Sequence, residues 1–532
     1  MHADAIIIGA GHNGLVAANL LADAGWEVVV LEATGQPGGA VRSGELAAPG
    51  YLSDLCSAFY PLAVCSPALR RLRLDEHGLR WRHAPDVLAH LLPDDRAVVL
   101  NRDPTQTAVS IDAFAPGDGE RWLATHREWR SVSNALVKTL LTPFPPVRHG
   151  FSLLRTLRAA GAIRMARRLI LSAEELSGEL FAGEGAKLLL TGCALHTDLS
   201  PHDAGGGVYG WLLAMLGQQY GFPVPDGGAQ RLTDALVARL AAKGGTLICD
   251  ARAVHVAVSG GRAAGVRCAG GQAFWARRAV LADVPAPALY LDLLDRRLLP
   301  ARLIDDMAHF RWDGATVKVD WALSSPVPWA NPAVGGAGTV HLGVDMRGLA
   351  RYAADLAAGD VPSRPFVLVG QMTTADPARS PAGTESLWAY THLPHAEHWP
   401  ADVIAEHAQR IQETIEKHAP GFAETIVGKH VSGPSDLEDE NPSLVGGALG
   451  GGTAAAYQQL FLRPIPGLGR ADTPIDGLFL ASASAHPGGG VHGAPGANAA
   501  RAALARHRAG FVYRAVMGAA HRALYRPSIV RP

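Results

Sequence analysis

The chain has 532 residues, which is too long for a single hydrophobic core, so we expect two domains. A formal net charge of -1 excludes a nucleic-acid-binding surface spread over the whole chain. The five cysteines form no Cys-x-x-Cys pair and show no Cys/His metal-ligand spacing. We therefore expect a reducing compartment, no dithiol redox chemistry and no bound metal.

Two features bear on localisation. The first apolar run begins within a few residues of Met1, and the most apolar stretch, residues 207–216, is about half the length that spans a bilayer. We therefore expect a cytoplasmic protein.

Residues 138–173 carry seven basic side chains and no acid, and residues 501–532 carry seven arginines and no acid. Solvated helix faces and peripheral contact with anionic lipid headgroups both explain these segments.

The amino-terminal residues 5–33 have the pattern of a dinucleotide-binding unit. A short apolar strand, residues 5–8, precedes a Gly-x-Gly-x-x-Gly motif, and an Ala- and Leu-rich helix over 13–24 leads to a second strand over 27–31. The first glycine allows a tight turn, the second lets the backbone approach a pyrophosphate, and the third lets the helix pack on the strand. The predicted binding residues of this loop are Gly9, Gly11, His12, Asn13 and Gly14.

An acid stands where the second strand ends. Glu32 lies 18 residues after Gly14, where a carboxylate accepts hydrogen bonds from the adenosine ribose hydroxyls, and Ala33 follows it. A carboxylate at this position suits an unphosphorylated ribose, because a 2′-phosphate is repelled.

The next residues distinguish between nucleotides. Gly38, Gly39 and Arg42 resemble the second glycine motif of FAD enzymes in the glutathione-reductase, amine-oxidase and phytoene-desaturase superfamily. Two glycines allow another close backbone approach, and an arginine can pair with a phosphate. No second strand–glycine–helix–acid unit follows, so we do not expect a pyridine nucleotide. The sequence therefore predicts FAD.

A glycine-rich stretch near the carboxyl end resembles the loop that supports the flavin ring in the same superfamily. A strand over 478–481 is followed by SASAHPGGGVHGAPG and a helix from about Ala494. Three adjacent glycines let a flat ring lie on the backbone, and the helix N-terminus stabilises negative charge on it. The predicted contacts are Ser482, Gly489, Gly490, Val491 and Ala494. Serine stands where many relatives carry an acid for the ribityl chain.

These motifs together resemble the phytoene-desaturase-related FAD oxidoreductases, most closely the branch of pyridine nucleotide-disulphide oxidoreductase domain-containing protein 2. The resemblance implies an α/β fold in which a Rossmann-type FAD-binding domain (1–75, 222–300 and 465–532) is interleaved with an α+β substrate domain. That second domain takes 76–221 and 301–464, with a helical cap. The resemblance also implies that the backbone at Val254 contacts the adenine and that Ala282 lies near FAD.

Four residues are predicted to act on the substrate. Trp388, Tyr390 and His392 alternate along a strand and so share one face, which in relatives crosses the substrate cavity. His486 directly precedes the glycines and could act as a base. Core packing and loop hydrogen bonding remain the alternatives for these residues, and Lys318 is a further titratable candidate.

We expect a desaturase or dehydrogenase that moves a hydride from its substrate to flavin N5. The resemblance implies a lipophilic substrate, of which isoprenoids and polyenes are the family's best-known kind. The electron acceptor, oxygen or a quinone, and the oligomeric state stay open. A flavin amine oxidase, a redox-neutral FAD-dependent isomerase and a non-catalytic escort protein on the same fold are the alternatives.

Overall fold

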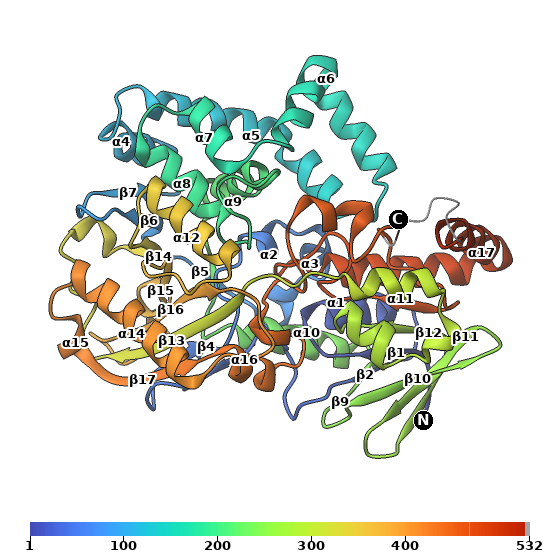
Figure 1. Cartoon of the computed structure of the whole chain (residues 1–532). Helices are drawn as coiled ribbons and strands as arrows, with labels where there is room; N and C mark the ends of the chain where they lie inside the picture. Colours follow the sequence, from blue (N-terminus) through green and yellow to red (C-terminus); the bar gives the residue numbers. More distant parts are fainter. Residues whose placement is uncertain (468, 527–532) are drawn as a thin grey trace.

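The computed structural model describes residues 1–467 and 469–526. Two seven-stranded sheets form the framework, one at the lower right and one at the left of Figure 1. The first sheet has the order β10-β11-β12-β1-β2-β9, with β18 beside β12. Its strands are β1 (His2–Ile8), β2 (Val28–Leu31), β9 (Thr246–Ile248), β10 (Ala253–Ser259), β11 (Arg262–Cys268), β12 (Ala273–Ala282) and β18 (Leu478–Leu480).

The second sheet has the order β17-β13-β16-β15-β14-β6-β7. Two short pairs, β3 with β4 and β5 with β8, lie outside both sheets. The strands are β3 (Ser43–Gly44), β4 (Ser53–Asp54), β5 (Trp81–Arg82), β6 (Asp86–Leu91), β7 (Ala97–Leu100), β8 (Val224–Pro225), β13 (Ala315–Leu323), β14 (Ala337–Leu342), β15 (Val367–Gln371), β16 (Glu385–Leu393) and β17 (Ile426–Ser432).

Helices cover both sheets, and a group of them stands above the second sheet in Figure 1. They are α1 (His12–Asp23), α2 (Pro61–Cys65), α3 (Pro67–Arg71), α4 (Pro104–Asp112), α5 (Asp118–Leu140), α6 (Val147–Arg168), α7 (Ala173–Leu180), α8 (Glu184–Ala194), α9 (Gly206–Tyr220), α10 (Gln230–Ala242), α11 (Ala301–Ala308), α12 (Met346–Ala358), α13 (Met372–Ala375), α14 (Ala401–His418), α15 (Phe422–Thr425), α16 (Pro434–Glu440) and α17 (Ala494–Leu524).

The first sheet has the arrangement that the amino-terminal motif predicts. Strands β9, β2, β1, β12 and β18 run parallel, and α1, α10 and α17 pack together on one face of them. Because both faces of β1 and β2 are covered, residues 5–8 of β1 and all of β2 are apolar and buried without alternation. This is the Rossmann-type topology.

The chain segments interleave between the two sheets. Every strand of the first sheet lies within 1–75, 222–300 or 465–532, and every strand of the second within 76–221 or 301–464. The domain boundaries drawn from the sequence are compatible with this division and stay a prediction. The predicted strands and helices occur with ends shifted by up to a few residues, and β12 begins six residues earlier than expected.

The last helix packs against the first at a glycine. A Cβ on Gly496 would lie 1.9 Å from the carbonyl oxygen of Asn13, so only glycine lets α17 approach α1 this closely. Contact between the two ends of the chain thus brings the carboxyl-terminal glycine loop next to the amino-terminal one.

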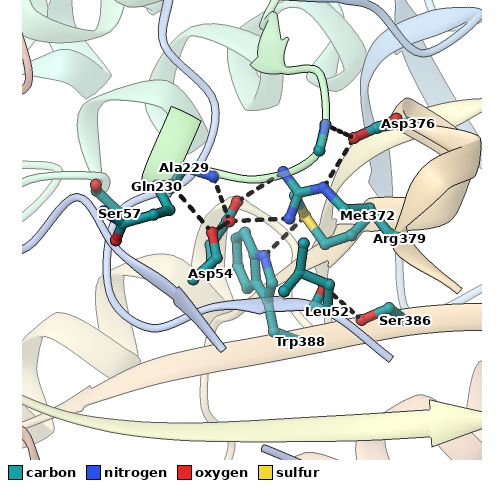
Figure 2. Close-up of polar contacts among 12 residues, drawn as sticks. Leu52, Asp54, Ser57, Ala229, Gln230, Met372, Asp376, Arg379, Ser386 and Trp388 are labelled. Carbon is teal, nitrogen blue, oxygen red and sulfur yellow. Dashed lines mark hydrogen bonds and ion pairs between the residues drawn. The ribbon is translucent and has the colours of Figure 1, made fainter. Parts of the chain in front are cut away.

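A buried arginine joins chain segments that are far apart in the sequence (Figure 2). Arg379 is fully buried and contacts Asp54 of β4 through Nη1 at 2.9 Å and Nη2 at 3.2 Å, while its Nε donates to Asp376 at 3.0 Å. Asp54 also accepts from the backbone N–H of Ala229, which precedes α10, and Asp376 accepts from that of Gly227. The network ties β4 and the start of α10 to the end of α13.

Within the described part of the chain, no helix has both the length and the apolar character needed to cross a bilayer.

Candidate active site

A cavity of about 980 Å³ runs between the two sheets. It begins at the carboxyl ends of β1, β2 and β12, where open α/β sheets bind nucleotides. It continues to β14, β16, α9 and the residue after α8. Predicted residues that line it are Gly9, Gly11, His12, Asn13, Glu32, Ala33, Gly39, Val254, Trp388, Tyr390, Ser482, Gly490 and Val491.

The amino-terminal glycines leave no room for side chains. Gly9 has a φ of +91°, in the left-handed region, and a Cβ on Gly14 would lie 2.2 Å from the Gly9 carbonyl oxygen. Two buried polar atoms beside this loop, Nε2 of His12 and Oδ1 of Asn13, have no hydrogen-bond partner among the described residues. Bare backbone and unpaired polar atoms on a cavity wall indicate a polar ligand.

Glu32 organises the adjacent turns. Its Oε2 accepts from the Ala10 backbone N–H at 2.8 Å, and its Oε1 accepts from the backbone N–H and the hydroxyl of Thr34, each at 2.9 Å. The carboxylate lines the cavity next to Ala33. It therefore fixes the glycine loop and keeps accepting capacity on the side where the ribose hydroxyls are expected.

A second carboxylate, Asp283, stands at the glycine loop. It follows β12 directly, and its Oδ2 accepts from the Gly14 backbone N–H at 2.7 Å, at the start of α1. Burial raises the pKa of Asp283 to about 7, the Gly14 N–H opposes this rise, and the charge of Glu32 adds to it. The predicted residue Ala282 is fully buried just before it and is not among the described lining residues.

The second glycine motif is fastened by Arg42. Gly38 donates its backbone N–H to the Ala10 carbonyl, and a Cβ on Gly39 would lie 3.3 Å from the Cα of Gly11. Arg42 donates to the Gly39 carbonyl through Nε at 3.0 Å, and its Nη2 contacts both the carbonyl and the carboxylate of Glu440 at 2.7 Å. The side chain thus links the motif to the end of α16, and the loop that follows α16 also lines the cavity.

The carboxyl-terminal glycines form a shelf on the cavity wall. Gly490, with a φ of +103°, and Val491 line the cavity, and so does Ser482, which comes just after β18. A Cβ on Gly489 would lie 2.8 Å from the Gly450 carbonyl oxygen, so this glycine serves the contact between two loops. Ala494 is buried at the start of α17 and packs behind the shelf.

Two charged side chains hold the facing loop, residues 446–453. Oδ2 of Asp313 accepts from the backbone N–H groups of Leu449 at 2.7 Å and Gly450 at 2.6 Å. The fully buried Arg463 donates to carbonyls of this loop and to the Ala483 carbonyl. The glycines of this loop therefore belong to the wall of the same cavity, since Gly451 lines it.

Aromatic side chains of β16 form the far wall. Trp388 and Tyr390 stack with centroids 5.8 Å apart, and Phe59 lies 6.0 Å from Trp388. His392, two residues further, has its ring centroid 5.5 Å from that of Tyr390, and its Nδ1 is 3.3 Å from the Thr316 hydroxyl. The alternation predicted from the sequence is present, with Trp388 and Tyr390 lining the cavity and His392 buried beyond them.

A histidine pair closes the same end. Nε2 of His196, which follows α8, lies 2.8 Å from Nε2 of His341 on β14, and His196 lines the cavity. Burial, and next the charge of His392, lowers the pKa of His196 to about 4. Burial and the neighbouring His196 and His90 lower that of His341 further. Both rings are therefore neutral at pH 7.

Two of the titratable candidates face elsewhere. The His486 ring contacts the Thr142 carbonyl at 3.1 Å and packs on Phe144, between α5 and α6. Burial lowers the pKa of His486 to about 4. Lys318 is buried on β13, where it pairs with Asp320. Neither His486 nor Lys318 is among the described lining residues.

The sequence analysis did not single out several lining residues. Asp283 had a signal, because it directly follows a predicted strand at the carboxyl edge of the sheet. The other lining residues come from loops, helices and a strand far apart in the chain, and no local sequence pattern pointed to them. They are Cys56, Phe59, His196, Leu213, Phe222 and Thr339.

The residues present fit FAD. The cavity joins a dinucleotide loop with an acid at its ribose position to a glycine shelf that can carry a flat ring. Val254 on β10 lies at the mouth, where the backbone is open to an adenine. The loop of α1, the glycine pair and the shelf come from three parts of the chain and face one space.

Comparison with known proteins identifies the family. The model of the flavin containing amine oxidoreductases matches residues 14–504. The chain is 28% identical to pyridine nucleotide-disulfide oxidoreductase domain-containing protein 2 of Rattus norvegicus, over 93% of this chain and 92% of that protein. It is 23% identical to a neurosporene-forming phytoene desaturase of Rhodobacter capsulatus, over 92% and 91%.

An oxidoreductase structure from Methanosarcina mazei superposes with a TM-score of 0.63 at 17% identity, covering 95% of this chain and 100% of that one. This likeness confirms the predicted fold class, and the sequence relatives confirm the predicted resemblance. The chain therefore belongs to the flavin-containing amine oxidoreductase family and is an FAD-dependent oxidoreductase.

Proposed function

We propose that the protein is a desaturase or dehydrogenase that oxidises a lipophilic substrate held at the second sheet. One observation carries this proposal, namely the composition of the cavity wall at that end. Phe59, Leu213, Phe222, Trp388 and Tyr390 supply apolar surface. The described carboxylates of the cavity wall do not lie on the strands of the second sheet. They lie beside the glycine loop (Glu32), after β12 (Asp283 and Asp292) and on α16 (Glu438). None of the described lining residues on the strands of the second sheet is charged, so a charged substrate has no counter-ion among them.

FAD, when bound, accepts two electrons with one hydrogen of the substrate. Forming a carbon–carbon double bond also releases a proton, which needs an acceptor. Of the titratable groups at the substrate end, Cys56 and Tyr390 stay protonated because burial raises both their pKa values, that of Cys56 to about 11. Burial lowers the pKa of His196 to about 4, so the ring is unprotonated at pH 7 and can accept a proton, as a weaker base than an unburied imidazole. We propose that His196 is this acceptor and that His341 fixes the orientation of its ring.

Two substrate classes are compatible with the aromatic wall. Stacked aromatic faces bind hydrocarbon by burial and also attract an ammonium group. A flavin amine oxidase is therefore the second candidate, favoured by Trp388 and Tyr390 lying on the cavity side of β16.

Anaerobic mixing separates the candidates. The FAD-loaded protein is mixed with phytoene or squalene, and in parallel with putrescine or benzylamine, while the visible flavin absorbance is followed. Bleaching by a hydrocarbon supports the proposal, and bleaching by amines alone replaces it with an amine oxidase. If dithionite bleaches the flavin but none of these donors does, the result points instead to an isomerase or an escort protein.

The proton acceptor is tested with the substrate that bleaches the flavin. His196→Gln should slow bleaching about 100-fold or more, since a positioned base contributes at least that factor. His202→Gln, an exposed histidine after α8, is the matched control. Equal bleaching rates in the two variants would show that His196 is not the proton acceptor. They would not change the conclusion about the substrate class.

A further inference from the structure

Helix α6 exposes large apolar side chains. Of its 22 residues, only Leu153 and Met165 are buried. Val147, Phe151 and Leu154 follow one another at i, i+4 and i+7 and are 72%, 70% and 56% exposed. This spacing forms a stripe on one side of the helix, and it faces away from the core. A contiguous apolar stripe on a surface helix marks a docking face.

Arginines border this stripe. Arg148 and Arg155 each follow a stripe residue by one position, so they lie about 100° around the helix from it. Arg158, whose φ of +56° interrupts α6, is exposed, and so is Arg164, which follows the exposed Ile163 directly. None of these four guanidinium groups forms an ion pair with any residue between 1 and 467 or between 469 and 526. Their charge is available to an outside partner.

The second half of α17 has the same character. After Gly510, whose φ of +51° interrupts the helix, Phe511, Val512 and Val516 are 75%, 65% and 61% exposed. Arg514 and Arg522 are exposed on the same segment and have no ion-pair partner in the described part of the chain. The last arginine of the basic segment, Arg531, lies outside the described residues.

A short apolar segment bridges the two helices. Phe461 packs on Phe144, just before α6, with centroids 5.5 Å apart, and Leu524 of α17 packs on Gly467. Tyr457, Leu460 and Phe461 are themselves 66%, 43% and 51% exposed. In Figure 1, α6 stands at the top of the molecule and α17 extends at its right edge. We call residues 147–170, 457–461 and 511–524 the α6–α17 surface.

We propose that the α6–α17 surface docks the protein on an anionic lipid bilayer. The argument for this occupant is charge complementarity combined with exposed apolar area. No acid occurs in 138–173 or 501–532, so the surface repels cationic partners and attracts phosphate headgroups. A bilayer interface accepts the phenylalanine and valine side chains while the arginines reach the headgroups. This inference is independent of the substrate proposed above.

The test uses vesicle sedimentation of the FAD-loaded protein. Vesicles of phosphatidylcholine with phosphatidylserine should bind it at low ionic strength, and those of phosphatidylcholine alone should bind it weakly. Each arginine near such a surface contributes about 1 kcal/mol. The triple variant Arg148→Gln, Arg155→Gln, Arg164→Gln should therefore lower the partition coefficient roughly 100-fold. The double variant Phe151→Ser, Phe511→Ser should lower it about tenfold.

A matched control carries the same charge change elsewhere. Arg347→Gln, Arg351→Gln, Arg364→Gln alters exposed arginines on and after α12, at the left of Figure 1, and should bind vesicles like the original chain. Unchanged flavin absorbance shows that each variant is folded.

Three results would overturn the proposal. The first is no binding to phosphatidylserine vesicles, and the second is an equal loss in both triple variants. The third is a dimer, seen by analytical ultracentrifugation, that dissociates in the double variant Phe151→Ser, Phe511→Ser, together with no protein in the sedimented vesicles. That outcome would assign the surface to contact between copies of this chain.

Discussion

The two ends of the cavity are built by different means. At the amino-terminal loop the wall is backbone, held by Glu32 and Asp283 through N–H groups. At the second sheet the wall is side chain, contributed by Phe59, His196 and the aromatic residues of β16. A backbone wall constrains which residues can occupy it, whereas a side-chain wall can change its occupants without altering the fold. We therefore expect the first end to fix the cofactor and the second to select the substrate.

The largest effect is expected where the two regions are joined. Arg379→Met leaves the carboxylates of Asp54 and Asp376 buried without their cation, as Figure 2 makes clear. Removing one partner of a buried pair costs about 3–5 kcal/mol, because the remaining charge stays desolvated. The urea midpoint of the variant should fall accordingly. Arg351→Met, on the exposed side of α12, should leave the midpoint unchanged, and equal midpoints for the two variants would mean that the Arg379 network does not stabilise the fold.

Breaking the backbone wall should give the next largest effect. In Gly14→Ala the new methyl group would meet the Gly9 carbonyl at 2.2 Å, so the loop must open. Overpacking of this kind costs about 1–3 kcal/mol, which corresponds to a loss of FAD affinity on the order of 10- to 100-fold. Titration of the apoprotein with FAD measures this loss of affinity. Gly178→Ala on α7, which has open space around it, is the control and should bind FAD normally.

Asp283 gives the backbone end a pH dependence. Burial raises its pKa to about 7, above the unfolded value of 3.8, so the protonated form is favoured in the folded protein. The stability that this provides is complete below pH 3.8 and is lost as pH rises through 7. Above pH 7 the carboxylate also adds negative charge beside the loop that receives a pyrophosphate.

FAD affinity of the apoprotein should thus weaken above pH 7, by at most about tenfold per pH unit. Asp283→Asn should flatten this profile, since an amide does not titrate. Glu45→Gln, a partly exposed acid away from the cavity wall, should keep the original slope. An unchanged slope in Asp283→Asn would assign the pH dependence to another group.

The same contrast explains what could be predicted from the sequence. The glycine loops were predictable because each is local, with Gly9, Gly11 and Gly14 inside one strand–turn–helix unit. His196 was not, because its partner His341 is 145 residues away and only the packing of α8 on the second sheet brings them together. Asp54 and Arg379, 325 residues apart, were unpredictable for the same reason. Local patterns do not encode pairs of this separation.

His486 shows that a position next to a binding loop in the sequence does not place a side chain next to the ligand. It precedes the glycine shelf, which predicted a place near the flavin, but its ring packs on Phe144 and contacts the Thr142 carbonyl. Buried there with a pKa lowered to about 4, it is neutral at working pH and has no contact with the described cavity wall. His486→Gln should therefore change the bleaching rate by less than about threefold, against the 100-fold expected for His196→Gln. A loss in His486→Gln that equals the one in His196→Gln, with FAD content intact, would mean that the loop rearranges to bring His486 to the substrate.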